Sequence, residues 1–480
     1  MSATAPATGI YIGGAWADSD EGFTVYDKYT LQPVAELMLA TESHVEAAVE
    51  SAVEAARKTL RPAQREEILN NTADLLDERA GEIESDYVAE TGFTPADAAG
   101  ELKRAANIFR LSAGEAIRIA GEEIPVAATP GSENRLAFTM RVPVGVVAAI
   151  SPFNAPLSTV AHKIGPAIAA GNSVVLKPAG VTPLSAIALT RALTDAGLPP
   201  GYLSLLTGPG ARTGTALVSH PDVRFVTFTG STAVGRDIRK NSGLARTHLE
   251  LGSNSVSIVA TDADLELVTD LVARAGYRKS GQVCTSVQRI LADSTVFDEL
   301  SELLAARVAT LEAGDPRNPQ SDIGPLISTE SASRAHDWID AARADGNRVV
   351  GGDLDGAVLQ PTLVISPSED SPLFNEEAFA PVVSLLAVDS TDEAIEKTNE
   401  GPYGLQVGFF TQDLDRAFDA ARRLEAGGVI INDTSSYHAD LMPYGGVKES
   451  GHGVEGPKYA VHDMTDPRLV VMNLRAPGGA

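Results

Sequence analysis

The chain has 480 residues, a formal net charge of −26 and 44% hydrophobic residues, enough for large buried cores. So acidic a chain lacks the basic surface that nucleic acids and anionic membranes require, and neither is an expected partner. No apolar run approaches the ~18 residues of a membrane-spanning helix, and the opening MSATAPATG has neither the basic nor the apolar region of an export signal, so we expect a cytoplasmic protein.

The segment 43–111 is predicted to be helical, because its apolar residues recur at spacings of three and four. Ser43, with Glu46 three residues later, predicts a helix N-terminus with a capping box. Residues 121–141 change to short β-like stretches around Pro130 and Gly131, which predicts a hairpin.

Strand-like apolar runs alternate with helix-sized segments over the rest of the chain. The first run, residues 144–150 (VGVVAAI), is continuous, as in parallel strands buried on both faces. This alternation predicts βαβ units, so we expect an α/β fold with two doubly wound, Rossmann-like domains and a small β element. The further strand-like runs are residues 173–176, 203–206, 225–229, 255–260, 349–350, 382–388, 429–432 and 468–472.

Three motifs follow predicted strands, at the sheet edge where α/β proteins bind ligands. Asn154 ends the motif SPFN and suits an oxyanion donor, although an Asn there is more often a turn former. The glycines of FTGSTAVG (228–235) would let phosphates approach a helix N-terminus, but most such turns bind nothing. Glu250, between two leucines, suits a general base with a raised pKa, whereas a solvated strand-end Glu is commoner.

Cys284 is the only cysteine, which excludes an intrachain disulfide and a cysteine-rich metal site, and no metal is expected. A lone cysteine is more often an inert buried residue than a nucleophile. Its segment, GQVCTS (281–286), is small and polar, however, and resembles a helix start, where a thiolate would be stabilised.

Together and in this order, the motifs resemble those of the aldehyde dehydrogenase superfamily, over nearly the whole chain. The resemblance is to the branch with lactaldehyde, phosphonoacetaldehyde and succinate-semialdehyde dehydrogenases. It implies a cofactor-binding domain (residues 1–118 and 144–251), a catalytic domain (252–450) and a bridging, oligomerisation element (119–143 and 460–480). The motifs are SPFN (151–154), AGNSVVLKP (170–178), FTGSTAVG (228–235), LELGSN (249–254), GQVCTSVQR (281–289), EEAFAPV (376–382), YGL (403–405) and PYGGVKESGHG (443–453).

The resemblance implies oxidation of an aldehyde to its carboxylic acid with NAD or NADP. Cys284 would be the nucleophile that forms a thiohemiacetal and then a thioester. Asn154 and the backbone N–H of Cys284 would hold the oxyanion, and Glu250 would activate the hydrolytic water.

Cofactor positions carry over in the same way. Lys177 matches the lysine at the adenosine ribose, Gly230, Ser231 and Gly235 match the pyrophosphate turn, and Glu377 with Phe379 matches the nicotinamide site. The other expected cofactor-binding residues are Ile150, Ser151, Pro152, Phe153, Ala179, Gly180, Gly210, Phe228, Val234, Leu251 and Gly252.

Three departures from the family pattern concern the cofactor. Gly180 replaces a glutamate that binds the ribose hydroxyls and repels a 2′-phosphate, so we expect NADP to be accepted alongside NAD. Ser253 stands where the family has glycine and would add bulk near the thiol. Ala378 and Ala380 replace larger or more flexible residues beside the nicotinamide position.

The substrate is expected to be a short polar or anionic aldehyde. Arg110 and His162 are candidates to hold an anionic tail in the substrate tunnel, although a surface arginine and a packed histidine fit the sequence equally well. The further pocket candidates are Thr285, Ser435, Ser436 and Tyr437.

Other functions share parts of this pattern. A CoA-acylating enzyme of the same fold is one alternative, but Glu250 favours water as the acyl acceptor. A cofactor-free thiol esterase would leave Lys177 and the turn 228–235 unexplained, and an inactive binding scaffold would not need Cys284 and Asn154. A hairpin with open edges is costly, so we expect it to pair with the tail strand 469–474 of a partner subunit in a homodimer or homotetramer.

Overall fold

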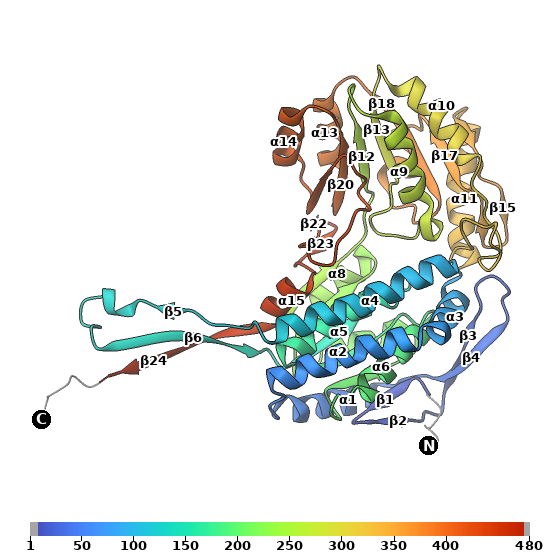
Figure 1. Cartoon of the computed structure of the whole chain (residues 1–480). Helices are drawn as coiled ribbons and strands as arrows, with labels where there is room; N and C mark the ends of the chain where they lie inside the picture. Colours follow the sequence, from blue (N-terminus) through green and yellow to red (C-terminus); the bar gives the residue numbers. More distant parts are fainter. Residues whose placement is uncertain (1–7, 475–480) are drawn as a thin grey trace, which may run out of the picture.

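The computed structural model describes residues 8–474, which form two lobes and a projecting three-stranded arm (Figure 1). The fold is α/β, as the sequence predicts, because each lobe has a mainly parallel sheet with helices on both faces. No helix in this described part of the chain is long and apolar enough to cross a membrane.

An eight-stranded sheet forms the centre of the lower lobe (Figure 1). In sheet order its strands are β2 (Ala15–Ala17), β1 (Ile10–Ile12), β9 (Leu203–Leu206), β8 (Ser173–Lys177), β7 (Val146–Ile150), β10 (Val223–Thr229), β11 (Arg246–Glu250) and β23 (Gly451–His452). The strands from β9 to β11 run parallel, whereas β1, β2 and β23 form antiparallel edges.

Alternate residues of β7 pack on opposite faces of this sheet, because side chains of a strand alternate in direction. Val147 and Ala149 face the core that holds α2, α4, α5 and α6, and Val146 and Ala148 face the core of α1, α7 and α8. Burial on both faces explains the continuous apolar run of the sequence. The helices of this lobe are α1 (Glu42–Ala56), α2 (Pro62–Glu78), α3 (Ala80–Thr91), α4 (Pro95–Ala116), α5 (Ser158–Ala170), α6 (Leu184–Asp195), α7 (Gly210–Val218), α8 (Thr232–Asn241) and α15 (Pro457–Asp463).

The predicted N-cap of α1 is wrong by two residues. The N-cap is Thr41, and its backbone N–H donates to Nδ1 of His44 at 3.1 Å. Ser43 instead lies in the first turn, where its hydroxyl is 2.8 Å from that of Thr41. Thr41 and His44 form the reciprocal contacts of a capping box. The predicted pair, Ser43 and Glu46, therefore does not cap the helix.

A seven-stranded sheet forms the upper lobe, parallel except for its edge strand β14. In sheet order the strands are β14 (Arg348–Val350), β17 (Thr362–Ile365), β18 (Val382–Val388), β13 (Arg289–Asp293), β12 (Val256–Val259), β20 (Gln406–Phe410) and β21 (Gly428–Ile431). One face is covered by α9 (Leu265–Tyr277) and α10 (Phe297–Val308), and the other by α11 (Thr329–Ala344), α12 (Pro372–Asn375), α13 (Thr391–Glu400) and α14 (Leu414–Arg423).

Short elements complete the fold. They are the strand pairs β3 (Gly22–Tyr26) with β4 (Pro33–Met38), β15 (Leu354–Asp355) with β16 (Val358–Leu359) and β19 (Tyr403–Gly404) with β22 (Val447–Lys448), and the 3-10 turns η1 (Val126–Ala128) and η2 (Arg278–Gly281).

The arm contains the predicted hairpin, but the prediction of its partner strand is wrong. β5 (Glu123–Ile124) pairs with β6 (Arg135–Pro143), and β24 (Thr465–Asn473) of the same chain pairs with β6 along its whole length. The tail starts beside the hairpin because α15 packs on α4 and α5. Arg141 links β6 to the start of β24, because its Nε donates to the Thr465 hydroxyl at 2.8 Å. Residues 475–480 of the expected bridging segment lie outside the described residues.

Candidate active site

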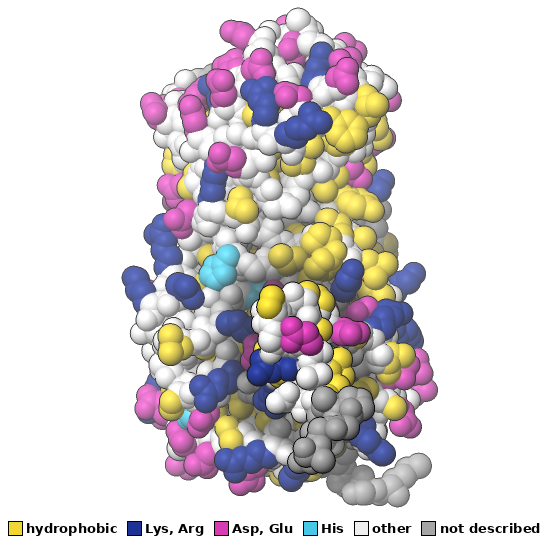
Figure 2. Space-filling view, turned by 90° about the vertical axis from the view of Figure 1, so that its left-hand side faces the viewer, with side chains coloured by type: hydrophobic (Ala, Val, Ile, Leu, Met, Phe, Trp, Pro, Cys, Tyr) yellow, Lys and Arg dark blue, Asp and Glu magenta, His cyan; other side chains and the backbone are white. Residues whose placement is uncertain are grey.

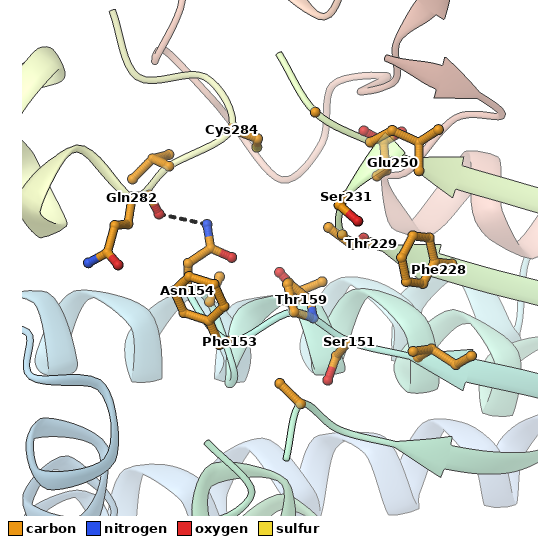
Figure 3. Close-up of a pocket in the computed structure, with 18 of the residues that line it drawn as sticks. Ser151, Phe153, Asn154, Thr159, Phe228, Thr229, Ser231, Glu250, Gln282 and Cys284 are labelled. Atoms are coloured by element: carbon orange, nitrogen blue, oxygen red, sulfur yellow. Dashed lines mark hydrogen bonds between the residues drawn. The ribbon is translucent and has the colours of Figure 1, made fainter. Parts of the chain in front are cut away.

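A cavity of about 1100 Å³ lies where the two lobes meet (Figure 3). The carboxyl ends of β7, β8, β10 and β11 form its floor in the lower lobe, and the loop before β13 closes it from the upper lobe. It extends from Lys177 and Gly210 to Cys284, so the predicted cofactor and catalytic residues share one space.

Cys284 lies in a turn after η2, so the predicted helix start is wrong. The chain takes three successive left-handed conformations at Lys279, Ser280 and Gly281. A Cβ on Gly281 would lie 2.0 Å from the backbone oxygen of Ala380, so only glycine fits there. Burial raises the pKa of the Cys284 thiol to about 11, although a hydrogen bond from the Tyr444 hydroxyl, 3.0 Å from Sγ, acts in the opposite direction.

Asn154 points from the loop after β7 toward the Cys284 segment, with Glu250 across the cavity (Figure 3). Its Nδ2 donates to the backbone oxygen of Gln282 at 2.8 Å, and its backbone oxygen accepts from Nζ of Lys279 at 3.0 Å. The amide has two N–H groups, so one remains for an oxyanion near the sulfur. These bonds fix the asparagine beside the nucleophile.

Glu250 ends β11 and is buried, and the predicted rise in its pKa is confirmed. Burial raises it, and the nearby charge of Glu455 raises it further. One carboxylate oxygen, Oε1, lies 3.2 Å from Nε2 of His248, and the buried Oε2 has no partner among the described residues. Despite its own burial, Glu455 has a pKa of only about 2, because Lys163 lies 3.1 Å away. Of the two carboxyl groups, Glu250 is therefore the one whose pKa is raised and Glu455 the one whose pKa is lowered.

The turn between β10 and α8 has the features of a phosphate-binding loop. Ser231 caps α8 and accepts from the N–H of Val234 at 3.4 Å, so the first helical N–H groups face the cavity. A Cβ on Gly230 would meet the Phe228 ring at 2.6 Å. Gly235 does not line the cavity; it is required because a Cβ would lie 2.4 Å from Leu251.

The adenosine end of the cavity is formed by Lys177 and the loop after β8. Lys177 Nζ donates to the backbone oxygen of Gly208 at 2.9 Å, and burial lowers its pKa to about 8. A Cβ on Gly180 would lie 3.1 Å from the same oxygen, so a larger residue there requires a small shift of the Gly208 backbone. Because residue 180 is a glycine, it contributes no carboxylate to this end of the cavity.

At the other end, Glu377 accepts from the N–H of Ser253 at 3.0 Å, and burial raises its pKa to about 7. The Phe379 ring meets Phe153 edge-on at 5.8 Å. The expected bulk of Ser253 is absent from the cavity lining, because its hydroxyl points to that of Ser255, 2.7 Å away. Ala378 and Ala380 are also absent from the lining.

Polar groups in the lining of this cavity suit a dinucleotide. The Ser151 hydroxyl is buried without a partner among residues 8–474, and the N-terminus of α8 lies at the cavity through Ser231 and Val234. Every residue expected to bind the cofactor lines the cavity, apart from the packing glycine at 235: Ile150, Ser151, Pro152, Phe153, Lys177, Ala179, Gly180, Gly210, Phe228, Gly230, Ser231, Val234, Leu251, Gly252, Glu377 and Phe379.

The substrate candidates divide into two groups. His162, Thr285 and Ser436 line the cavity. Arg110 does not, and its predicted place in the tunnel is wrong: its guanidinium makes exposed ion pairs with Asp74 and Asp77 at 2.9 and 2.6 Å. Tyr437 is half exposed and also lies outside the lining, as does Ser435, which is buried and donates to the backbone oxygen of Thr285.

Arg104, which sequence reasoning missed, stands where Arg110 was expected. Its Nε donates to Asp440 at 2.6 Å, and its Nη2 lies 2.7 Å from Nδ1 of His438. Burial and the Arg104 charge lower the pKa of His438 to about 3, so this histidine is neutral and accepts. Asp97, Gly100, Glu101 and Arg104 repeat at helical spacing on one face of α4, a signal that could have located the cavity side.

Lys163, Glu455, His438 and Tyr444 were also missed. Lys163 had a signal, because a lone lysine inside the apolar helix α5 is expected only with a buried partner. Glu455 follows the last glycine-rich motif and reaches Lys163 through tertiary structure alone. The cavity thus holds a thiol, an amide donor and a buried carboxyl group at one end and the residues expected to bind the cofactor at the other.

Comparisons with known proteins agree with this geometry. The family model described as "Aldehyde dehydrogenase family" matches residues 16–470. The 3-sulfolactaldehyde dehydrogenase of Priestia aryabhattai is 47% identical, over 97% of this chain and 98% of its own. A lactaldehyde dehydrogenase of Methanococcus maripaludis is 36% identical, over 97% and 100%. The solved NADP-dependent glyceraldehyde-3-phosphate dehydrogenase from Bacillus halodurans, complexed with NADP, superposes with a TM-score of 0.95 at 35% identity, over 98% and 100%. The chain therefore belongs to the aldehyde dehydrogenase family and oxidises an aldehyde with NAD or NADP.

Proposed function

We propose that this aldehyde dehydrogenase oxidises a short aldehyde with an anionic tail, with a hydroxyaldehyde sulfonate as the leading candidate. The observation that carries the proposal is the Arg104 guanidinium in the cavity wall, held by Asp440. Arg278 lines the cavity too and makes no ion pair with a carboxylate among residues 8–474. A strongly acidic protein that keeps three arginines at this cavity, Arg104, Arg278 and Arg334, is suited to an anion, and the relative named for 3-sulfolactaldehyde supports a sulfonate.

The chain's own residues suit the chemistry. The Cys284 sulfur, having lost its proton to solvent, attacks the aldehyde carbon as the thiolate, so that an S–C bond forms and the carbonyl π pair moves to oxygen. Asn154 Nδ2–H and the backbone N–H of Cys284 donate to that oxygen, where negative charge develops. A bound nicotinamide supplies the acceptor for the hydride of the same carbon. Glu250, once ionised, takes a proton from water as the water attacks the thioester and the sulfur leaves.

NADP is proposed as an accepted cofactor together with NAD. Gly180 places no carboxylate beside the adenosine ribose site, so a 2′-phosphate meets no like charge there. Lys177, whose pKa burial lowers to about 8, lies at the same end of the cavity and is cationic below that pH. A solved neighbour complexed with NADP supports this assignment.

We further propose a homodimer, or a dimer of dimers, assembled through the arm. The arm projects away from both lobes in Figure 1 and exposes apolar side chains of β6 and β24, among them Met140, Leu469 and Val471. Figure 2 faces this side and shows hydrophobic side chains on the surface beside the arm. Strand β21 is the edge of the upper sheet and exposes Ile431, so it offers unpaired backbone groups to a partner.

An aldehyde panel tests the substrate. Short sulfonate, phosphate and carboxylate aldehydes are compared with neutral aldehydes of equal length, by the absorbance of reduced nicotinamide, with NADP and with NAD. We expect kcat/KM at least about tenfold higher for an anionic substrate, the effect of one charged hydrogen bond. Equal or higher values for the neutral aldehydes contradict the proposal. A rate that depends on added CoA would instead favour the acylating alternative, and absence of reduced nicotinamide would favour an esterase or a scaffold.

A further inference from the structure

We propose that Tyr444 is a catalytic residue whose hydroxyl donates a hydrogen bond to the ionised sulfur of Cys284. The inference rests on the proposed role of Cys284 as nucleophile. It concerns the side-chain hydroxyl in the PYGG segment, which the sequence motif alone leaves without a function.

The contact is direct and enclosed. The Tyr444 hydroxyl lies 3.0 Å from Sγ of Cys284, and no other partner for it occurs among the hydrogen bonds of residues 8–474. Both residues line the cavity, and Tyr444 is buried. The hydroxyl therefore faces the reacting atom from within the site.

The backbone of Tyr444 is fixed from the opposite side. Its N–H donates to the backbone oxygen of Glu455 at 3.2 Å, and its own oxygen accepts from the Glu455 N–H at 2.6 Å. The His438 ring meets the Tyr444 ring edge-on at 4.9 Å. A Cβ on the next residue, Gly445, would lie 2.2 Å from the backbone oxygen of Gly453, so the loop that carries Tyr444 packs closely against this segment.

The proton belongs to the tyrosine when the sulfur is ionised. Burial and the neighbouring Cys284, Glu250 and Glu455 raise the pKa of Tyr444 well above its ordinary value. A thiol is a weak donor and a weak acceptor, whereas a thiolate is a strong acceptor, so the bond strengthens as Cys284 loses its proton. Three carboxyl groups face the sulfur, Glu250 from β11, Glu377 from the segment before β18 and Glu455 from the segment after β23, and all disfavour its negative charge. The hydrogen bond from Tyr444 acts in the opposite direction and favours the ionised sulfur.

The size of the effect follows from general values. A hydrogen bond to a charged group corresponds to a shift of about one to two pKa units for the thiol. The nucleophilicity of a thiolate falls as its basicity falls, by about threefold per unit. Loss of the hydroxyl should therefore lower the rate of alkylation of Cys284 by about threefold to tenfold at neutral pH, and should raise it by about threefold to tenfold above both pKa values.

The test is the alkylation of Cys284 by iodoacetamide as a function of pH, in wild type and in Tyr444→Phe. Because the chain has one cysteine, the reagent reports a single site. We expect the pKa of alkylation to rise by about one to two units, with the two rate curves crossing at high pH. Tyr437→Phe is the matched control, since Tyr437 lies seven residues earlier, is half exposed and does not line the cavity; its curve should coincide with that of wild type.

Two results would overturn the proposal. One is an unchanged alkylation pKa in Tyr444→Phe, and the other is an equal loss of rate that persists above the thiol pKa of both proteins, which indicates altered packing. Circular dichroism verifies the fold, and fluorotyrosine placed at 444 alone gives an independent measurement: its more acidic hydroxyl should lower the alkylation pKa, and no change or a rise opposes the proposal. Alkylation requires no turnover, so failure of the proposed function is seen separately, as aldehyde oxidation that survives in Cys284→Ser.

Discussion

Replacing Arg104 by glutamine removes the charge that we propose binds the anionic tail, while keeping a donor beside Asp440. The Asp440 side chain is 9% exposed and accepts from Nε of Arg104 at 2.6 Å, so a variant with no donor would leave a largely enclosed carboxylate underpaired. Glutamine can still donate to Asp440, and Nδ2 of Asn107 donates to it at 3.1 Å. The change therefore acts mainly on the charge offered to a substrate.

The magnitude follows from the hydrogen bonds at stake. A hydrogen bond between charged groups contributes about 1.5–3 kcal/mol, which corresponds to a loss of about tenfold to one hundredfold in kcat/KM. The loss should be confined to anionic aldehydes, and a neutral aldehyde of equal length should change less than about threefold. Arg104 also holds the pKa of His438 down, so the assay is run near pH 8, where an ordinary histidine is neutral in both proteins.

The matched control is Arg110→Gln. Arg110 lies on the same helix, carries the same charge and makes two exposed ion pairs outside the cavity. Its replacement should leave kcat/KM unchanged for both aldehydes. The reasoning is refuted if Arg104→Gln lowers kcat/KM equally for the anionic and the neutral aldehyde, or if the Arg110 variant shows the same selectivity loss.

Three further predictions concern the cofactor, the base and the arm. Gly180→Glu should lower kcat/KM with NADP by at least about tenfold relative to NAD, because it sets a carboxylate near the 2′-phosphate. Gly180→Gln, which is of equal size, is the control. An equal effect of both variants would assign the loss to a shift of the Gly208 backbone. Because burial raises the pKa of Glu250 and the base acts when ionised, kcat limited by hydrolysis should rise with pH well above 4.5; a limb at that ordinary value speaks against Glu250 as the base. Removal of residues 465–480 deletes β24 and should reduce the mass found by light scattering to that of a monomer, whereas an unchanged mass rules out assembly through the arm.

The fold could be predicted from the sequence where burial on both faces leaves a local pattern. β7 and its neighbours are continuous apolar runs, because every side chain of such a strand is buried. The pairing of β24 could not be predicted in the same way. It depends on α15 returning the chain to the base of the hairpin, a tertiary contact that no local pattern records.

The candidate site shows the same limit. Cys284, Asn154 and Glu250 were predicted because each lies in a motif that resembles one of the aldehyde dehydrogenase superfamily, whereas the local pattern alone left an inert cysteine, a turn-forming asparagine and a solvated glutamate open. The choice of Arg110 over Arg104 was wrong because both lie on α4, and only packing shows which helix face lines the cavity. The surroundings of the thiol escaped prediction for a related reason: three left-handed residues and the distant Tyr444 determine them.

The central claim is that Cys284 carries the acyl group and that Glu250 releases it to water. It is tested most directly with Glu250→Gln, mixed with aldehyde and NADP and analysed by rapid mixing and by mass spectrometry of the intact chain. We predict a burst of about one reduced nicotinamide per active site, followed by slow turnover, with the acyl group held on Cys284. Full steady-state turnover in this variant, or a burst that leaves Cys284 unmodified, would contradict the account.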